Sequence, residues 1–71
     1  MKRTTLTGKR MRISVDANGV VKCQRPCSHG VGRWTTFSTR IFDGGQEEFR
    51  RWAREYIRTV EGLVDADITE A

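Results

Sequence analysis

The stretch DGGQEEFRRWAREYIRTVEGLV, residues 43–64, decides the fold of this chain. Its apolar residues recur at the i, i+3, i+4, i+7 spacing of one helix face: Phe49, Trp52, Ala53, Tyr56, Ile57, Val60, Leu63 and Val64. Charged residues fill most of the positions between them, so the pattern predicts an amphipathic helix from Asp43 to about Val64. Asp43 is the expected N-cap, with Gln46 as its capping-box partner. A lone helix of this length is marginal in water, so the rest of the chain must cover its apolar face.

The residues before the helix predict an antiparallel sheet. Apolar and polar side chains alternate over residues 9–15, which is typical of a half-buried strand, and residues 20–24 form the returning strand. Proline and glycine predict a loop over residues 25–33. Residues 34–42, rich in β-branched and aromatic side chains, predict a third strand whose buried face the pattern leaves open. The expected fold is therefore α+β: a three-stranded antiparallel sheet with one C-terminal helix packed on one face.

The register of the hairpin follows from its apolar residues. A two-residue Asn18-Gly19 loop would put apolar and polar side chains on the same face. A three-residue loop, with Gly19 left-handed, pairs Val15 with Val21. We expect the second register, because a slip of one residue turns every side chain to the other face. Its buried face carries Met11, Ile13, Val15, Val21 and Cys23. Its opposite, basic face carries Arg10, Arg12, Ser14, Lys22 and Gln24.

Length and composition limit what the chain can be. Its 71 residues predict one small domain with a thin core. Residues 1–8 and 65–71 are expected to be flexible, with Ile68 tucked back. No apolar run approaches the roughly 20 residues that cross a membrane, and no signal peptide is recognisable. Two cysteines are too few for a disulfide framework, so we expect a reducing cytoplasm.

Charge is unevenly distributed. Through Arg40 the chain has nine Lys or Arg and one acid, whereas from Ile41 onward it has four Arg and eight acids. Such asymmetry indicates contact with nucleic acid or an acidic protein surface, although mixed charges also simply keep a small domain soluble. The candidate contact residues are Arg10, Arg12, Lys22, Arg25, Arg33 and Arg40. Arg50, Arg54 and Arg58 form a second stripe on the helix, which a solvated helix face explains more simply.

The only metal-like cluster is Cys23-x₃-Cys27-x-His29. Structural zinc takes four ligands and this spacing offers three, while Cys23 also suits the core as a small buried residue. We therefore expect no metal or other cofactor. A single histidine, no carboxylate pair in an expected pocket and no phosphate-binding loop motif predict a protein that is not an enzyme.

Two resemblances bear on function. The segment TFSTRIF at residues 36–42, followed by QEEF at 46–49 and WARE at 52–55, is similar to the way arm-type DNA-binding domains of phage and transposon integrases enter their helix. This resemblance implies direct DNA binding by the sheet face. The chain carries no integrase catalytic residues.

The second resemblance covers roughly residues 13–55. Ile13 and Val15, then Asn18-Gly19, Phe42-Asp43 and Trp52, stand in an order and spacing similar to small phage anti-CRISPR proteins. This resemblance implies a phage or mobile-element protein that inhibits a host nucleic-acid-targeting complex by protein–protein contact. Direct DNA binding is the alternative, and a subunit whose partner covers part of the helix is a third. The expected partner is thus a host protein, a ribonucleoprotein complex or DNA, and an open sheet edge would also permit a homodimer.

Overall fold

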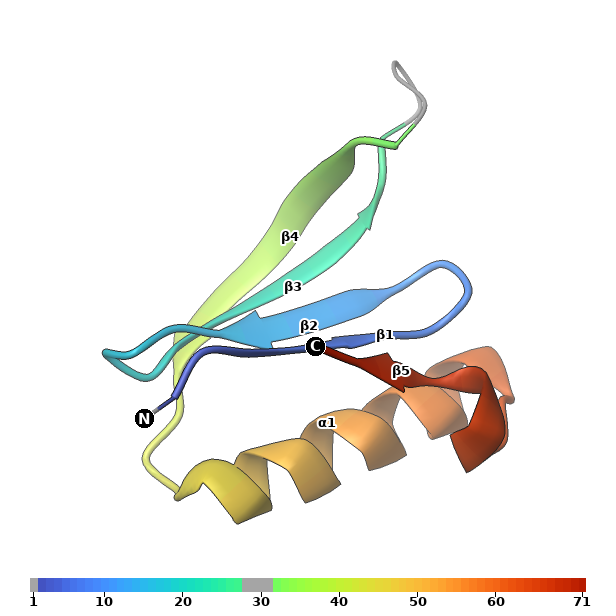
Figure 1. Cartoon of the computed structure of the whole chain (residues 1–71). Helices are drawn as coiled ribbons and strands as arrows, with labels where there is room; N and C mark the ends of the chain where they lie inside the picture. Colours follow the sequence, from blue (N-terminus) through green and yellow to red (C-terminus); the bar gives the residue numbers. More distant parts are fainter. Residues whose placement is uncertain (1, 28–31) are drawn as a thin grey trace.

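The structure is a computed structural model that describes residues 2–27 and 32–71. Its strands are β1 (Thr4–Thr7), β2 (Arg12–Val15), β3 (Val20–Pro26), β4 (Trp34–Ile41) and β5 (Thr69–Glu70). They form one antiparallel sheet in the order β4-β3-β2-β1-β5, with the helix α1 (Gln46–Glu61) beneath it (Figure 1). A short 3₁₀ helix, η1 (Asp65–Asp67), leads into β5. The α+β class is confirmed, but the predicted number of three strands is wrong.

The two additional strands come from the chain ends. In β1, Leu6 pairs with Ile13 of β2 on one side and with Glu70 of β5 on the other. Leu6 is fully buried, and Ile68 is buried in the same cluster, in agreement with its expected position against the core. The ends that were expected to be flexible thus contain strands, β1 and β5, in the described residues. One leucine among threonines gives no alternation to recognise, although threonine itself favours strands.

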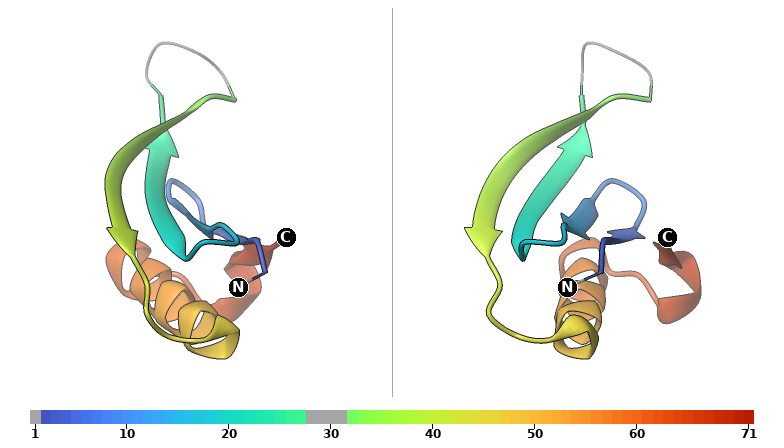
Figure 2. Two further views of the ribbon diagram at one scale, coloured as in Figure 1. Left: turned by 90° about the vertical axis from the view of Figure 1, so that its left-hand side faces the viewer. Right: turned by 60° about the vertical axis from the view of Figure 1, so that its left-hand side comes forward.

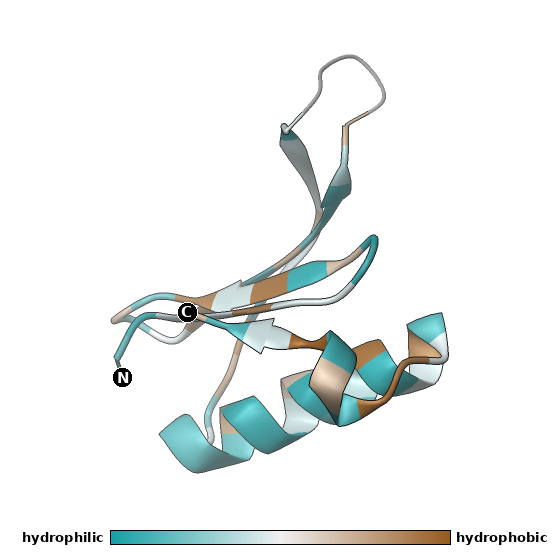
Figure 3. Cartoon of the chain, turned by 45° about the vertical axis from the view of Figure 1, so that its right-hand side comes forward, coloured by the Kyte–Doolittle hydropathy of each residue, from teal (hydrophilic) through white to brown (hydrophobic). Residues whose placement is uncertain are grey.

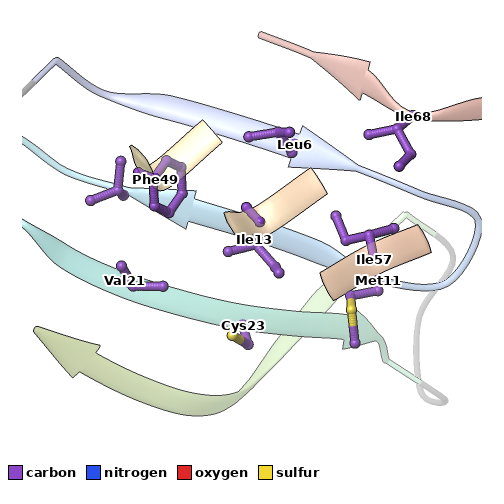
Figure 4. Close-up of a cluster of buried hydrophobic side chains, with 10 residues drawn as sticks. Leu6, Met11, Ile13, Val21, Cys23, Phe49, Ile57 and Ile68 are labelled. Atoms are coloured by element: carbon purple, nitrogen blue, oxygen red, sulfur yellow. The ribbon is translucent and has the colours of Figure 1, made fainter. Parts of the chain in front are cut away.

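The hairpin of β2 and β3 has the predicted register. Val15 pairs with Val21 and Ile13 with Cys23, and Gly19 closes the loop in a left-handed conformation with φ 81°. The five predicted inward side chains are buried with Leu6, Phe49 and Ile57 (Figure 4). The apolar pattern of the hairpin was therefore sufficient to fix which face it buries.

The helix begins differently from the prediction. Gly45 is the N-cap and no side chain caps it, so the predicted capping role of Asp43 is wrong. The Gln46 side chain contacts the Thr4 hydroxyl, and its oxygen accepts the backbone N–H of Lys2 at 3.1 Å. Gln46 therefore ties the start of α1 to β1 instead of completing a capping box.

The buried stripe of α1 is narrower than its apolar pattern. Phe49, Ala53 and Ile57 are buried, whereas Trp52 is half-buried and Tyr56 is 39% exposed. Rings of Phe42, Trp52 and Tyr56 form a row at the edge of the core, with centroids 5.9 and 5.7 Å apart. The C-terminal part of β3 and the N-terminal part of β4 curve away from the helix (Figure 2). Little of the sheet therefore covers this flank of α1.

The third predicted strand, β4, contains a bulge. Cys23 pairs with Ser38 and Gln24 with Thr36, which leaves Phe37 as the extra residue. Phe37 is 43% exposed and Ile41 is 64% exposed. The bulge does not bring both faces of the strand to the core. The loop predicted from residue 25 starts later, because β3 continues to Pro26.

Candidate functional site

The sheet face opposite α1 is polar and basic. Two rows of side chains cross it, and neither row contains an acid. One row runs through Thr5, Ser14, Lys22 and Thr39. The other runs through Thr7, Arg12, Gln24 and Thr36. We call this surface the open face. Arg12 and Lys22, predicted here from the hairpin register, do lie on it.

Arg12 is held in place on the open face. Its Nε–H donates to Gln24 Oε1 at 2.8 Å, and Gln24 Nε2 donates to Thr36 Oγ1 at 3.0 Å. The Arg12 guanidinium carbon lies 4.6 Å from the centroid of the Trp34 ring, a cation–π contact. Trp34 therefore belongs to the open face, which its place in the strand pattern had left undecided. A guanidinium oriented in this way is ready to meet an anion without first losing its side-chain freedom.

A hollow of about 310 Å³ lies on the open face, and the side chains that line it include Arg3, Arg12 and Lys22. No ion pair joins these three cations to an acid within residues 2–27 and 32–71. The contribution of Arg3 was missed, because the sequence assigned it to a flexible end. The pairing of β1 with β2 brings Arg3 to the hollow, and the apolar pattern of the sequence does not predict that pairing.

Asp16 is the single acid that lines the hollow. Its Oδ1 accepts the N–H of Val20 at 3.0 Å and of Asn18 at 2.8 Å, so it stabilises the turn between β2 and β3. These hydrogen bonds, the Val20 bond above all, hold the pKa of Asp16 below its usual value, and the charges of Lys22 and Arg3 act in the same direction. The carboxylate is thus committed to the turn.

The other predicted sheet cations do not join the open face. The guanidinium carbon of Arg25 lies 5.6 Å from the centroid of the Phe37 ring, and that of Arg40 lies 5.7 Å from the centroid of the Trp52 ring of α1. Both arginines therefore contact aromatic rings that are not part of the open face. Arg33 is exposed just before β4. Arg10 is in the turn between β1 and β2, and its backbone N–H donates to Glu61. The predicted set is therefore divided over separate surfaces.

The three helix arginines predicted as contact residues are paired with acids. Arg50 Nη1 lies 2.7 Å from Glu47 Oε1, and Arg50 Nε lies 2.9 Å from Glu70 Oε2. Arg54 Nη2 lies 3.4 Å from Glu70 Oε1. Arg58 reaches Asp65 at 3.7 Å. The hydrogen bond and charge of Glu70 raise the pKa of Arg50 further. This flank of α1 is hydrophilic (Figure 3), and its cations hold the C-terminal tail. The predicted second stripe is not a set of unpaired cations.

The metal-like cluster gains no support from the geometry. Cys23 is buried in the core, and this burial raises the pKa of its thiol, which disfavours the thiolate that zinc requires. Cys27 is half-buried, and His29 lies outside the described residues. In the part of the chain that the structure describes, no three potential metal ligands come together.

Comparison with protein-family models, curated proteins and solved structures found no match to this chain. Both resemblances noted in the sequence therefore stay predictions. Within residues 2–27 and 32–71, no helix has the length and apolar character needed to cross a bilayer.

Proposed function

We propose that this protein is a non-enzymatic binding module that contacts the phosphates of nucleic acid through its open face. The observation that carries the proposal is the grouping of Arg3, Arg12 and Lys22 around one hollow without an acid paired to any of them in the described residues. Phosphate contacts supply most of the affinity of nucleic-acid binding that is not sequence-specific. Arg12 has the planar donor group that suits a phosphate, and its orientation by Gln24 and Trp34 lowers the entropy cost.

The rows of threonine and serine support the same function. Thr5, Ser14, Thr36 and Thr39 surround the cations, and hydroxyl groups are common donors to phosphate oxygens. A sheet face can also lie in a groove of DNA, as in ribbon-type binders. Trp34 adds an aromatic ring at the margin, although Arg12 covers one side of it.

Binding to a short mixed-sequence DNA duplex, followed by fluorescence anisotropy across a salt series, tests this proposal. Three phosphate contacts should give a slope of log K against log salt of about −2.7. The double variant Arg12→Glu with Lys22→Glu should abolish binding while the fold is retained. Lys9→Glu with Arg51→Glu is the matched control, because it makes the same change in net charge at exposed sites outside the open face.

If the control weakens binding as much as the Arg12 and Lys22 variant, net charge rather than the open face attracts DNA. If no DNA binds even at low salt, the phosphate function is wrong.

An inhibitor of a host nucleic-acid-targeting complex, of anti-CRISPR type and acting in the host cytoplasm, is the second candidate. It would use the same cations against carboxylates of a protein surface. Exposed apolar side chains favour it, since Phe37 and Ile41 on β4 and Tyr56 on α1 are the kind of residues that protein interfaces bury. Pull-down from host lysate, with the Arg12 and Lys22 variant as control, separates this function from DNA binding.

A further inference from the structure

The two edges of the sheet are very different. At one edge, β5 has only two residues, and Ala71 extends its pairing with β1 by exchanging N–H···O bonds of 2.9 and 2.8 Å with Thr5. At the other edge, β4 has eight residues, no proline and one charged residue, Arg40. No described segment pairs with its outer side. A long edge of this kind is a template for another strand.

The segment of β4 after the bulge is suited to pairing. Phe42 donates its N–H to Gly19 at 2.9 Å, and antiparallel pairing alternates. The N–H and C=O groups of Thr39 and Ile41 therefore point outward, away from β3. The four residues from Ser38 to Ile41 equal β1 and β2 in length, so they suffice for a ladder.

An apolar groove lies close to this edge. It measures about 280 Å³ and is lined mainly by carbon atoms of α1 side chains, from Trp52, Glu55, Tyr56, Thr59 and Val60. Trp52 connects the groove to the strand, because its ring lies 5.7 Å from the Arg40 guanidinium and 5.9 Å from the Phe42 ring. A strand added to β4 would thus bring its inward side chains toward exposed Tyr56 and Val60.

Charge selects the occupant. The strands β3 and β4 carry Lys22, Arg25 and Arg40 and contain no acid. Arg25 and Arg40 lie over the aromatic rings of Phe37 and Trp52, and neither forms an ion pair with an acid in the described residues. A second copy of this chain would bring the same cations against them, and like charges placed opposite each other on a sheet are destabilising. An acidic strand complements them.

We propose that the edge of β4 and the groove beside it bind an extended acidic segment of a partner protein by strand addition. Backbone bonds to Thr39 and Ile41 would supply affinity. Specificity would come from inward side chains that alternate between an acid near Arg40 and an apolar group in the groove. This interaction goes beyond nucleic-acid binding. It uses Arg40, the α1 groove and backbone groups of β4, including that of Thr39, but not the open-face cations Arg3 and Arg12, so either activity can fail while the other holds.

A fluorescein-labelled peptide with Asp and Val in turn at every second position and Thr between them is the probe, because its Asp and Val then share one face of the strand. The same peptide with Lys in place of Asp is its charge control. We expect the acidic peptide to bind and the basic peptide to bind at least about tenfold more weakly. Arg40→Glu should reverse this preference, whereas Lys9→Glu, the same change at an exposed site away from β4, should preserve it. Equal binding of the two peptides, or no binding of either, would overturn the proposal.

Two further substitutions separate the edge from the groove. Thr39→Pro removes an outward N–H without breaking the bonds to β3 and should weaken the acidic peptide about tenfold or more, while Thr39→Val should change it less than about twofold. Val60→Asp should weaken it similarly. Val64→Asp is the matched control, because Val64 is 62% exposed, against 56% for Val60, but does not line the groove.

Circular dichroism checks that each variant is folded. If Thr39→Pro unfolds the domain, Val60→Asp against Val64→Asp and the Arg40 reversal still decide the outcome. Unchanged binding by Val60→Asp would overturn the role of the groove. A dimer in size-exclusion chromatography with light scattering that Thr39→Pro dissociates would show that a second copy occupies the edge, and would also overturn the proposal.

Discussion

Three arginines of α1 are paired with acids, whereas the cations of the open face are not paired with any acid in the described residues. Arg50 and Arg54 both reach Glu70, an acid that the C-terminal tail brings to the helix. Arg12 and Lys22 have no such acid paired to them among the described residues. The difference is made by the C-terminal tail, which adds β5 to the sheet and places Glu70 beside α1. Whether a charge is available for binding is thus decided by tertiary pairing, which can remove a run of cations from the surface that a partner meets.

Among the substitutions that test this contrast, the loss of Ile68, which anchors the C-terminal tail, should have the largest effect on stability. Ile68 is buried beside Leu6 and Ile57, so Ile68→Ala should lower the free energy of unfolding by about 2–4 kcal/mol through lost burial and a residual cavity. Urea denaturation followed by Trp fluorescence measures it. Val64→Ala, at an exposed position, is the control and should change stability by less than about 0.5 kcal/mol. Equal small effects would mean that the tail acids are not held against α1 by Ile68.

A second prediction concerns Glu61, the acid at the end of α1, and its packing against the turn between β1 and β2. Glu61 accepts the backbone N–H of Lys9 at 2.8 Å and also that of Arg10, so it closes the turn between β1 and β2. Gly8 allows this approach: a Cβ there would overlap Glu61 Oε2 and lie 2.6 Å from Ile57 Cγ2. Gly8→Ala should therefore destabilise the fold by about 1–3 kcal/mol in thermal unfolding. A loss below about 0.5 kcal/mol would contradict the close approach.

The helix pairs themselves should contribute less. Glu70→Gln removes the partner of Arg50 and Arg54 and should cost up to about 1 kcal/mol, since these side chains are partly exposed. Lys22→Gln, on the open face, should stay within about 0.5 kcal/mol. The loss in Glu70→Gln should shrink in high salt, because salt screens the lost pairs in the parent protein. Equal losses for both substitutions would remove the contrast between the two groups of cations.

The parts of the fold that could be predicted from the sequence are those with a strong apolar period. The helix, the hairpin register and the inward face of β2 and β3 followed from alternation and turn chemistry alone. β1 and β5 could not be predicted in this way. The single apolar residue of β1 is Leu6, and β5 has only the neighbouring Ile68, so β1 becomes a strand by pairing with β2, and β5 by pairing with β1. The helix cap was missed because Gln46 bonds to β1, a partner more than 40 residues away.

The candidate site divides in the same way. Arg12 and Lys22 were predicted to share a face, because a strand period of two fixes side-chain direction. Arg3 was missed with its strand, and Arg40 was placed with the others, although it contacts Trp52 of α1. Neither the bulge at Phe37 nor the turning of β4 away from the helix is encoded in a local pattern. The groove beside β4 could therefore be found only in three dimensions.

Asp16 provides the finest test of the contrast, because it is an acid that lines the same hollow as the open-face cations. Its pKa is lowered by the N–H groups of Val20 and Asn18 and by Lys22 and Arg3. A lowered folded-state pKa means that the ionised carboxylate stabilises the fold above its unfolded pKa, near 3.8, and that this contribution is lost as the pH falls through the folded value. Asp16→Asn keeps the acceptor oxygen and removes the charge.

The parent protein should accordingly be more stable than Asp16→Asn at pH 7, and the two should converge in acid below pH 3.8. Urea denaturation at a series of pH values measures this, and a constant difference down to low pH would contradict the assigned cause. Under the proposed function, Asp16→Asn also removes the only negative side chain that lines the hollow, so DNA binding at pH 7 should tighten while stability falls. Opposite signs for binding and stability would separate the role of Asp16 in the turn from its effect on the cations. If DNA binding weakened in step with stability, the carboxylate would matter to the open face only through the turn that it holds.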